Sequence, residues 1–227
     1  MCLDRIVCLA NSYKHENRCV AGISLTTKRW VRLIGAETPG CLTVEQTCYA
    51  DGKEAEVLDV FEAEVAESCA TNSHPEDVLI AAKSLHLLRR FESSRDARFL
   101  ASYLNKGPAL LQSYGDRLYR RKIDGRPLEH SLELIHPEDL WWWVRVDKGK
   151  RKNRALFRAG STVRARYDLA VTDPQWLARL CGLSPGIYSH AEFFAGTTPN
   201  TYLTISLSEA FEGFHYKLVA GVINVPA

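Results

Sequence analysis

Residues 161–182 have the sequence STVRARYDLAVTDPQWLARLCG, and this stretch decides the fold that we expect. Its first half alternates apolar and polar residues from Val163 to Leu169, which is typical of a strand with one buried face. Its second half begins with Asp173 and Pro174, a helix N-cap and a first-turn proline, and closes at Gly182. The stretch therefore predicts a strand that leads directly into a short helix.

Further strands are predicted on both sides of this strand and helix. Before them come apolar runs over 140–146 and 154–158, and after them come runs over 201–207 and 214–224. We set aside a shorter run over 132–135 as a connector. Three strands, a helix and two more strands make the element order of a five-stranded Greek-key barrel, the OB-fold.

The N-terminal third predicts a similar start. Runs over 5–10, 18–25 and 29–34 are rich in β-branched and other apolar residues, which indicates three strands. The polar, turn-prone residues 11–17 predict a loop between the first two strands. Residues 57–65 alternate apolar with acidic residues near their end and predict a further strand with one wet face.

The middle of the chain has a different period. Between residues 75 and 114, apolar residues recur at steps of three and four, which predicts two amphipathic helices. The overall prediction is a mainly β chain with an α insert, in which two OB-like Greek-key β-barrels are joined by a helical middle segment. The predicted boundaries are 1–74 for the first barrel, 75–128 for the helical connector and 129–227 for the second barrel.

Composition and charge exclude some classes of protein and favour others. The 227 residues are 46% hydrophobic and 25% charged, with a formal net charge of +2, which excludes a disordered chain. The charge is uneven, because residues 1–77 hold 7 basic and 13 acidic side chains whereas 78–227 hold 22 and 14. Residues 145–166 alone hold nine basic side chains against the single acid Asp147. Such a concentration of cations predicts a polyanion-binding face.

Several classes of protein are excluded by missing patterns. No stretch reaches the roughly 18 to 20 apolar residues of a membrane-spanning helix, and the N-terminus lacks a secretory signal pattern. We therefore expect a cytoplasmic protein with no membrane partner. The seven cysteines show no CxxC, and no nucleotide-loop, metalloprotease or serine-hydrolase motif occurs. We expect a non-catalytic protein with no metal site and no cofactor.

Two sets of residues are candidates for ligand contacts. On a strand, alternation within the triplet 141–143 exposes either Trp142 or the pair around it, and we assign base stacking to Trp142. The predicted nucleic-acid-binding residues are Arg145, Lys150, Arg151, Lys152, Arg154, Arg164, Arg166 and Trp142. Donors suited to phosphates or base edges also gather near the first predicted loop. The predicted ligand-binding loop residues are Asn11, Ser12, Lys14, His15, Arg18 and Arg32.

Stretches at both ends of the chain carry a family resemblance. They are CLANSYKH at 8–15 and RCVAGI at 18–23, and then AVTDP at 170–174 and YLTISLSE at 202–209. Together they resemble the bacterial dual OB-containing domain family. The resemblance implies two OB-like barrels, no catalytic motif, and a role in nucleic-acid or nucleotide recognition.

These observations predict a non-catalytic recognition module that binds single-stranded or structured DNA or RNA through the basic surface of the second barrel. Two alternatives stay open. One is an adaptor that docks a nuclease-type or helicase-type protein effector through the tryptophan triplet and the helical middle. The other is a sensor of a nucleotide or another small ligand at the predicted loop.

Overall fold

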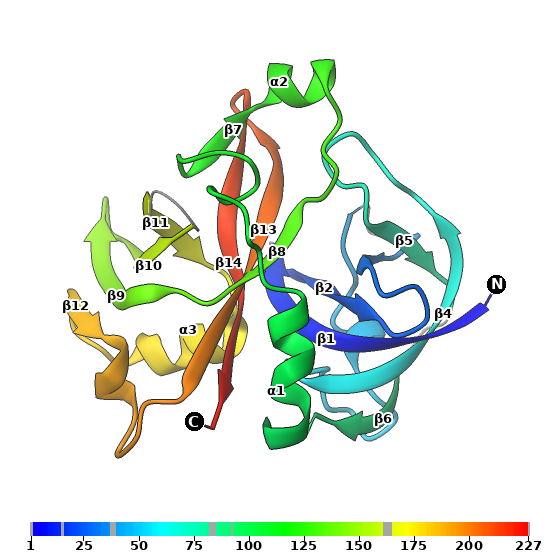
Figure 1. The fold of residues 1–227 in the computed structure, drawn as a ribbon, viewed down its shortest axis with the longest axis horizontal. Coiled ribbons are helices and arrows are strands. Elements are labelled where there is room, and N and C mark those ends of the chain that lie inside the picture. Colours follow the sequence, from blue (N-terminus) through cyan, green and yellow to red (C-terminus); the bar gives the residue numbers. More distant parts are fainter. Residues whose placement is uncertain are drawn as a thin grey trace. The chain divides into compact units, whose positions relative to one another are not determined.

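The computed structural model describes residues 2–14, 16–36, 40–81, 85–91, 93–160 and 165–226, the side chains of 93–97 excepted. The chain divides into two compact units. The N-terminal unit is Met1–Glu92 with Ile123–Ser131, and the C-terminal unit is Ser93–Lys122 with Leu132–Ala227. Each unit is built around its own β-sheet (Figure 1).

The N-terminal unit contains a closed five-stranded barrel. Its strands are β1 (Cys2–Lys14), β2 (Asn17–Ser24), β3 (Trp30–Ile34), β4 (Asp59–Ser68) and β5 (Asp77–Ile80). They follow the order β1-β2-β3-β5-β4, and pairing of β1 with β4 closes the barrel. Because β3 and β5 run parallel while the other neighbours run antiparallel, this is the OB-fold arrangement. A sixth strand, β6 (His86–Arg90), pairs with β4, and a 3₁₀ turn, η1 (Glu45–Thr47), precedes β4.

The core of this barrel is apolar and tightly packed. Ile6, Leu33 and Phe61 come from three different strands and are fully buried. On β2, a Cβ atom at Gly22 would lie 1.9 Å from the carbonyl oxygen of Val7 on β1. Glycine at this position therefore allows the two backbones to approach closely next to the irregular register of β1.

The C-terminal unit repeats the same strand order within a larger sheet. Its strands are β7 (Arg117–Tyr119), β8 (Leu132–Ile135), β9 (Glu138–Asp147), β10 (Lys150–Ala159), β11 (Ala165–Val171), β12 (Gly186–Ser189), β13 (Asn200–Phe211) and β14 (Phe214–Val225). The path β9-β10-β11-β14-β13 matches that of the first barrel, including a parallel pair, β11 and β14. β12 extends the sheet beside β9, β8 extends it beside β13, and β7 pairs with β14.

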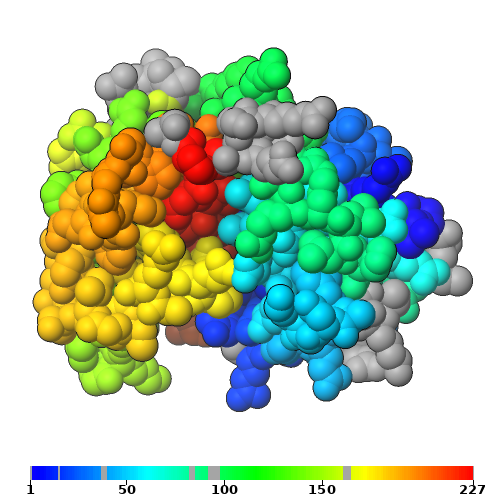
Figure 2. Space-filling view, turned by 90° about the horizontal axis from the view of Figure 1, so that it is seen from below, coloured from blue at the N-terminus to red at the C-terminus, as the bar shows by residue number. Residues whose placement is uncertain are grey.

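The helices are short. They are α1 (Ser93–Ser102), α2 (Arg120–Gly125) and α3 (Pro174–Cys181), with a 3₁₀ turn, η2 (His190–Phe193), after β12. Asp173 caps α3 as predicted, because its Oδ1 accepts a hydrogen bond from the backbone N–H of Trp176 at 3.0 Å. Its Oδ2 accepts another from the N–H of Val222 on β14 at 2.7 Å, which ties the helix to the sheet. The surfaces of α3, yellow, and of the segment before β13, orange, adjoin in Figure 2.

The structure confirms two OB-type units but corrects the middle of the chain. The prediction of the first of two helices between residues 75 and 114 is wrong, since this part of the chain forms β5 and β6. β5 completes the N-terminal barrel beside β3, so tertiary pairing overrides the helical period of the local sequence. The segment 75–128 is thus only partly helical, through α1 and α2. The run at 132–135, set aside as a connector, is β8 and pairs with β13.

Among the described residues, no helix combines the length and the apolar character needed to cross a membrane.

Candidate nucleic-acid interface

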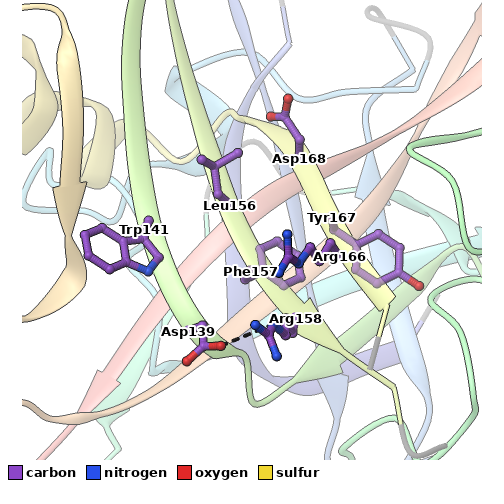
Figure 3. A pocket seen from close by; sticks show the side chains of 8 residues that line it. All are labelled: Asp139, Trp141, Leu156, Phe157, Arg158, Arg166, Tyr167 and Asp168. Carbon is purple, nitrogen blue, oxygen red and sulfur yellow. Dashed lines mark ion pairs between the residues drawn. The ribbon is translucent and has the colours of Figure 1, made fainter. Parts of the chain in front are cut away.

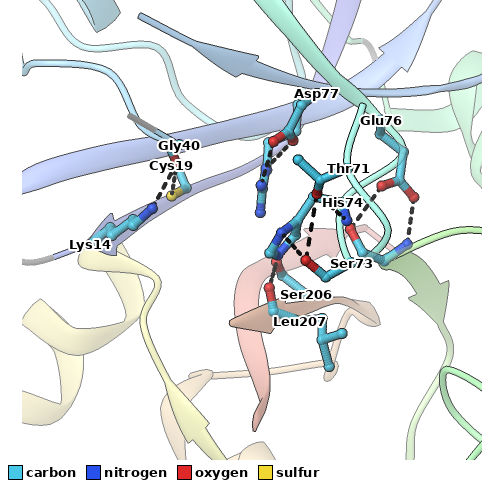
Figure 4. Close-up of polar contacts among 12 residues, drawn as sticks. Lys14, Cys19, Gly40, Thr71, Ser73, His74, Glu76, Asp77, Ser206 and Leu207 are labelled. Atoms are coloured by element: carbon cyan, nitrogen blue, oxygen red, sulfur yellow. Dashed lines mark hydrogen bonds and ion pairs between the residues drawn. The ribbon is translucent and has the colours of Figure 1, made fainter. Parts of the chain in front are cut away.

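The predicted ligand-binding loop of the N-terminal unit is not a loop. β1 continues to Lys14 and β2 begins at Asn17, and these two residues are partners in the antiparallel register. Asn11 and Ser12 lie within β1 and are buried, and the Asn11 amide donates to the carbonyl of Ala55 at 2.8 Å. The Lys14 ammonium donates to the carbonyl of Gly40 at 3.0 Å (Figure 4). His15 lies outside the described residues.

The two arginines assigned to that loop form buried ion pairs. Arg18 donates from Nε and Nη2 to Glu54 at 2.7 and 2.9 Å. Arg32 donates from Nε and Nη2 to Asp77 at 2.7 and 2.8 Å, and Figure 4 shows the Asp77 carboxylate receiving both bonds. Such bidentate pairs orient both partners firmly. The prediction for Arg18 and Arg32 is therefore wrong: both guanidiniums bind to carboxylates of the same unit and are buried.

The outer face of the C-terminal sheet brings cations and exposed rings together. Cross-strand partners share a face, and the register pairs Arg145 with Lys152, Trp143 with Arg154, and Trp141 with Leu156. Arg158 and Arg166 are partners between β10 and β11. We call this surface the outer stripe, and its residues are Trp141, Trp143, Arg145, Lys152, Arg154, Leu156, Arg158 and Arg166.

Trp142 points to the opposite side. It has no solvent exposure, and its indole N–H donates to Nδ1 of His190 at 3.0 Å. Its ring lies 4.6 Å from that of Trp176, centroid to centroid. The assignment of base stacking to Trp142 is therefore wrong, because a buried ring offers no face to a ligand. Alternation allowed either Trp142 or the pair Trp141 and Trp143 to face outward. In the structure the pair faces outward, and Trp141 is 43% exposed.

The cations of the outer stripe differ in how they are held. The guanidinium of Arg145 lies over the Trp143 ring at 4.7 Å, a cation–π contact. Arg154 is ion-paired with Asp168, and Arg158 Nε lies 3.2 Å from the Asp139 carboxylate. Lys152 and Arg166 are exposed and form no ion pair with another residue that the structure describes. Lys152 and Arg166 are therefore the cations best placed for phosphate contacts.

Of the three other predicted cations, Arg151 lies on the opposite face of β10 from the outer stripe. Arg151 Nη2 donates to the carbonyl oxygens of Leu180 and Leu183, the latter at 2.8 Å, so it satisfies groups at the C-terminal end of α3. Lys150 is exposed at the β9–β10 turn and pairs in register with Asp147. Arg164 lies outside the described residues.

A pocket of about 580 Å³ opens at one end of the outer stripe (Figure 3). Trp141, Leu156, Arg158 and Arg166 line it, together with Asp139, Phe157, Tyr167 and Asp168. A bulge in β9 shapes its rim: two residues, Asp139 and Leu140, face Phe157, and Asp139 has a positive φ of 51°. Burial raises the pKa of the Tyr167 phenol, whose oxygen accepts a hydrogen bond from the N–H of Leu110. Tyr167 therefore lines the pocket as a neutral group.

The sequence prediction missed Trp141, Trp143, Arg158 and Asp139. Three of these had a detectable signal. Once Trp142 is placed inside, alternation puts Trp141 and Trp143 outside. Arg158 had a similar signal, because it shares parity with Arg154. Asp139 had none, since the bulge that orients it depends on pairing with β10.

Among the described residues, no group of three or more His, Cys, Asp or Glu side chains could hold a metal ion.

The model of one protein family, described as the dual OB-containing domain, matches residues 4–222. A search of curated proteins found no match.

Proposed function

The chain belongs to the dual OB-containing domain family, and from this premise we propose that it binds single-stranded or structured nucleic acid through the outer stripe. The observation that carries the proposal is the exposure of Trp141 between cations on strands β9 to β11. OB-folds bind oligonucleotides on this part of the barrel surface. Basic grooves with stacking rings are how such surfaces hold single strands.

The arrangement of the outer stripe supports an extended ligand. From Lys152 to Arg158 the stripe covers six residue steps of β10, or about 20 Å at the usual rise per residue. Arg145 and Lys152 are at one end, Arg158 and Arg166 are at the other, and the indoles lie between them. A strand along this surface would place phosphates near both ends and bases over the rings.

The proposal is tested by titrating labelled single-stranded DNA and RNA into the protein across a salt series. The affinity should fall steeply with salt, because each neutralised phosphate contributes a slope of about −0.7 for single strands. Replacing both Lys152 and Arg166 with alanine should reduce that slope by about 1.4, since two phosphate contacts are lost. Replacing Trp141 with alanine should weaken binding about tenfold with no change in slope.

Matched controls come from the N-terminal unit. Arg29 and Lys53 are exposed there, so R29A with K53A removes the same charge away from the outer stripe. This double variant should retain the wild-type affinity and slope. Absence of binding at low salt, or an equal loss in both double variants, would contradict the proposal.

A further inference from the structure

A second group of exposed rings and cations lies at the end of the β13–β14 hairpin. The hairpin turns at Glu212 and Gly213, whose φ values of 48° and 81° are those of a primed turn. β7 pairs with the first residues of β14, with Tyr119 opposite Phe214 and Arg117 opposite Tyr216. This pairing places side chains of β7 and β14 on one common face.

These side chains form a continuous stack of rings and guanidiniums. Arg117 lies over the Phe214 ring at 4.4 Å and near the Tyr216 ring at 5.9 Å. The Tyr119 and Phe214 rings are 4.8 Å apart, and Arg121 lies over Tyr119 at 5.1 Å. We call this group, together with Phe211, the hairpin stack. Its alternation of π faces and cations is the chemistry that holds unpaired bases and their phosphates.

The hairpin stack lies on the same side of the sheet as the outer stripe. Ala170 of β11 and Leu218 of β14 are partners in the parallel pair, so they share a face. Alternation along β11 then places Arg166 on that face, and alternation along β14 places Tyr216 and Phe214 there. Between them, His215 is buried on the inner side. The outer stripe and the hairpin stack are therefore parts of one surface of the C-terminal unit.

Two rings of the hairpin stack are exposed to solvent, and Phe214 and Tyr216 are half-buried. Phe211 is 64% exposed and pairs with Phe214 across the hairpin, which places it on the same face. Tyr119 is 47% exposed. Large apolar rings that gather on a surface, with cations among them, mark an interaction site more often than rings scattered singly.

The hairpin stack is also held in place before any ligand arrives. The Lys217 ammonium is buried and donates to the carbonyl oxygens of Ser113 and Gly115, the latter at 2.7 Å. The N–H of Lys217 donates to the Asp116 carbonyl at 2.8 Å. The segment that leads into β7 is thus fixed beside β14. Such preorganisation lowers the conformational cost of binding.

We propose that the hairpin stack is a second stacking subsite, which binds unpaired bases of the same single strand that the outer stripe contacts. This inference rests on the proposed function, and it adds that the C-terminal unit binds long single strands more tightly than short ones. Phe211 supplies an open ring for stacking, and Arg117 and Arg121 supply phosphate contacts between rings.

The test compares a short with a long labelled thymidine oligomer, of about 4 and about 12 nucleotides, within the range that one OB-fold covers. The wild type should bind the long oligomer at least tenfold more tightly per molecule. Phe211→Ala should weaken binding of the long oligomer about tenfold and leave the short one unchanged, because the short strand is held by the outer stripe. Phe211→Tyr, which keeps an aromatic ring, should bind the long oligomer with the wild-type affinity.

The outcomes separate the two proposals. If the wild type binds neither oligomer, the proposed function fails and the subsite fails with it. If the wild type binds both and F211A weakens neither, or weakens both equally, the subsite is refuted while the proposed function stands. Since Phe211 is exposed at a hairpin end, its replacement should not unfold the unit, and a circular dichroism melt of each variant checks this.

Discussion

Acidification should destabilise the C-terminal unit through His190, a histidine buried against Trp142, Trp176 and the Phe194 ring. The Trp142 N–H donates to Nδ1, so the proton of the neutral ring is on Nε2, which donates to Oγ1 of Thr201 at 2.7 Å. Oγ1 of Thr201 in turn donates to Oδ1 of Asn224 at 2.8 Å. Burial lowers the pKa of His190 from 6.5 to about 4, and the nearby Arg179 adds to the effect.

The size of the effect follows from proton linkage. Well above pH 6.5 the ring is neutral in both folded and unfolded chains, so His190 contributes nothing to the pH dependence of stability there. As the pH falls from 6.5 towards 4, the unfolded chain takes up a proton that the folded chain does not, and stability is lost. At about 1.36 kcal/mol per pH unit, about 2.5 kcal/mol should be lost by pH ~4.5.

The assay is urea unfolding followed by tryptophan fluorescence at a series of pH values, for the wild type and His190→Gln. Trp142 and Trp176 lie in the His190 cluster, so the signal reports on this unit. Burial raises the pKa of Asp173, whose protonation therefore favours the folded state as the pH falls. That opposing contribution is present in both proteins and cancels in their difference.

The glutamine variant should be less stable at neutral pH but should lose about 2.5 kcal/mol less between pH ~7 and ~4.5. Parallel stability curves for the two proteins over this range would refute the assignment of a neutral, buried imidazole.

Three further substitutions separate structural from binding residues. Replacing Arg32 with alanine should lower the free energy of unfolding by about 3 kcal/mol or more, because it leaves the buried carboxylate of Asp77 without its guanidinium. Urea denaturation measures this loss. Under conditions where the variant is fully folded, its affinity for oligonucleotides should equal that of the wild type. Replacing Gly22 with alanine should prevent folding or lower the melting temperature sharply, since its Cβ would clash with the Val7 carbonyl oxygen; a calorimetric melt equal to wild type would contradict the close approach. Replacing Arg151 with alanine should lower the free energy of unfolding, measured in urea, by about 1 to 2 kcal/mol, because carbonyl groups at the end of α3 lose their donor. If the variant instead kept its stability and lost only salt-dependent binding, Arg151 would be a nucleic-acid contact.

Much of the C-terminal unit could be predicted from local sequence. The cap at Asp173 and the alternation around Tyr167 are signals carried by adjacent residues, and both agree with the structure. The middle of the chain could not be predicted in this way. Residues that repeat at helical steps became β5 because β3 offers a parallel partner that completes the barrel. Helical period is a weak preference compared with closure of a barrel.

In the candidate site, too, local sequence predicted some features, whereas the availability of single side chains depended on the fold. Sequence alone located the basic segment 145–166 and the tryptophan triplet at 141–143, just before it. It could not show which cations are occupied, because the partners of Arg151 and Arg154 are carbonyl and carboxylate groups distant along the chain. It also could not separate Arg18 from a ligand site, since Glu54 is 36 residues away.

The amino-acid sequence by itself determined that the C-terminal unit forms strands in OB order, with a capped helix and one dense group of cations, because these depend on neighbouring residues. Only the tertiary structure decided which tryptophans face solvent, which arginines are neutralised, and which rings and cations gather beside β7 to form the hairpin stack. The physical reason is that a charge or a ring becomes available to a ligand only when no distant part of the chain satisfies it first.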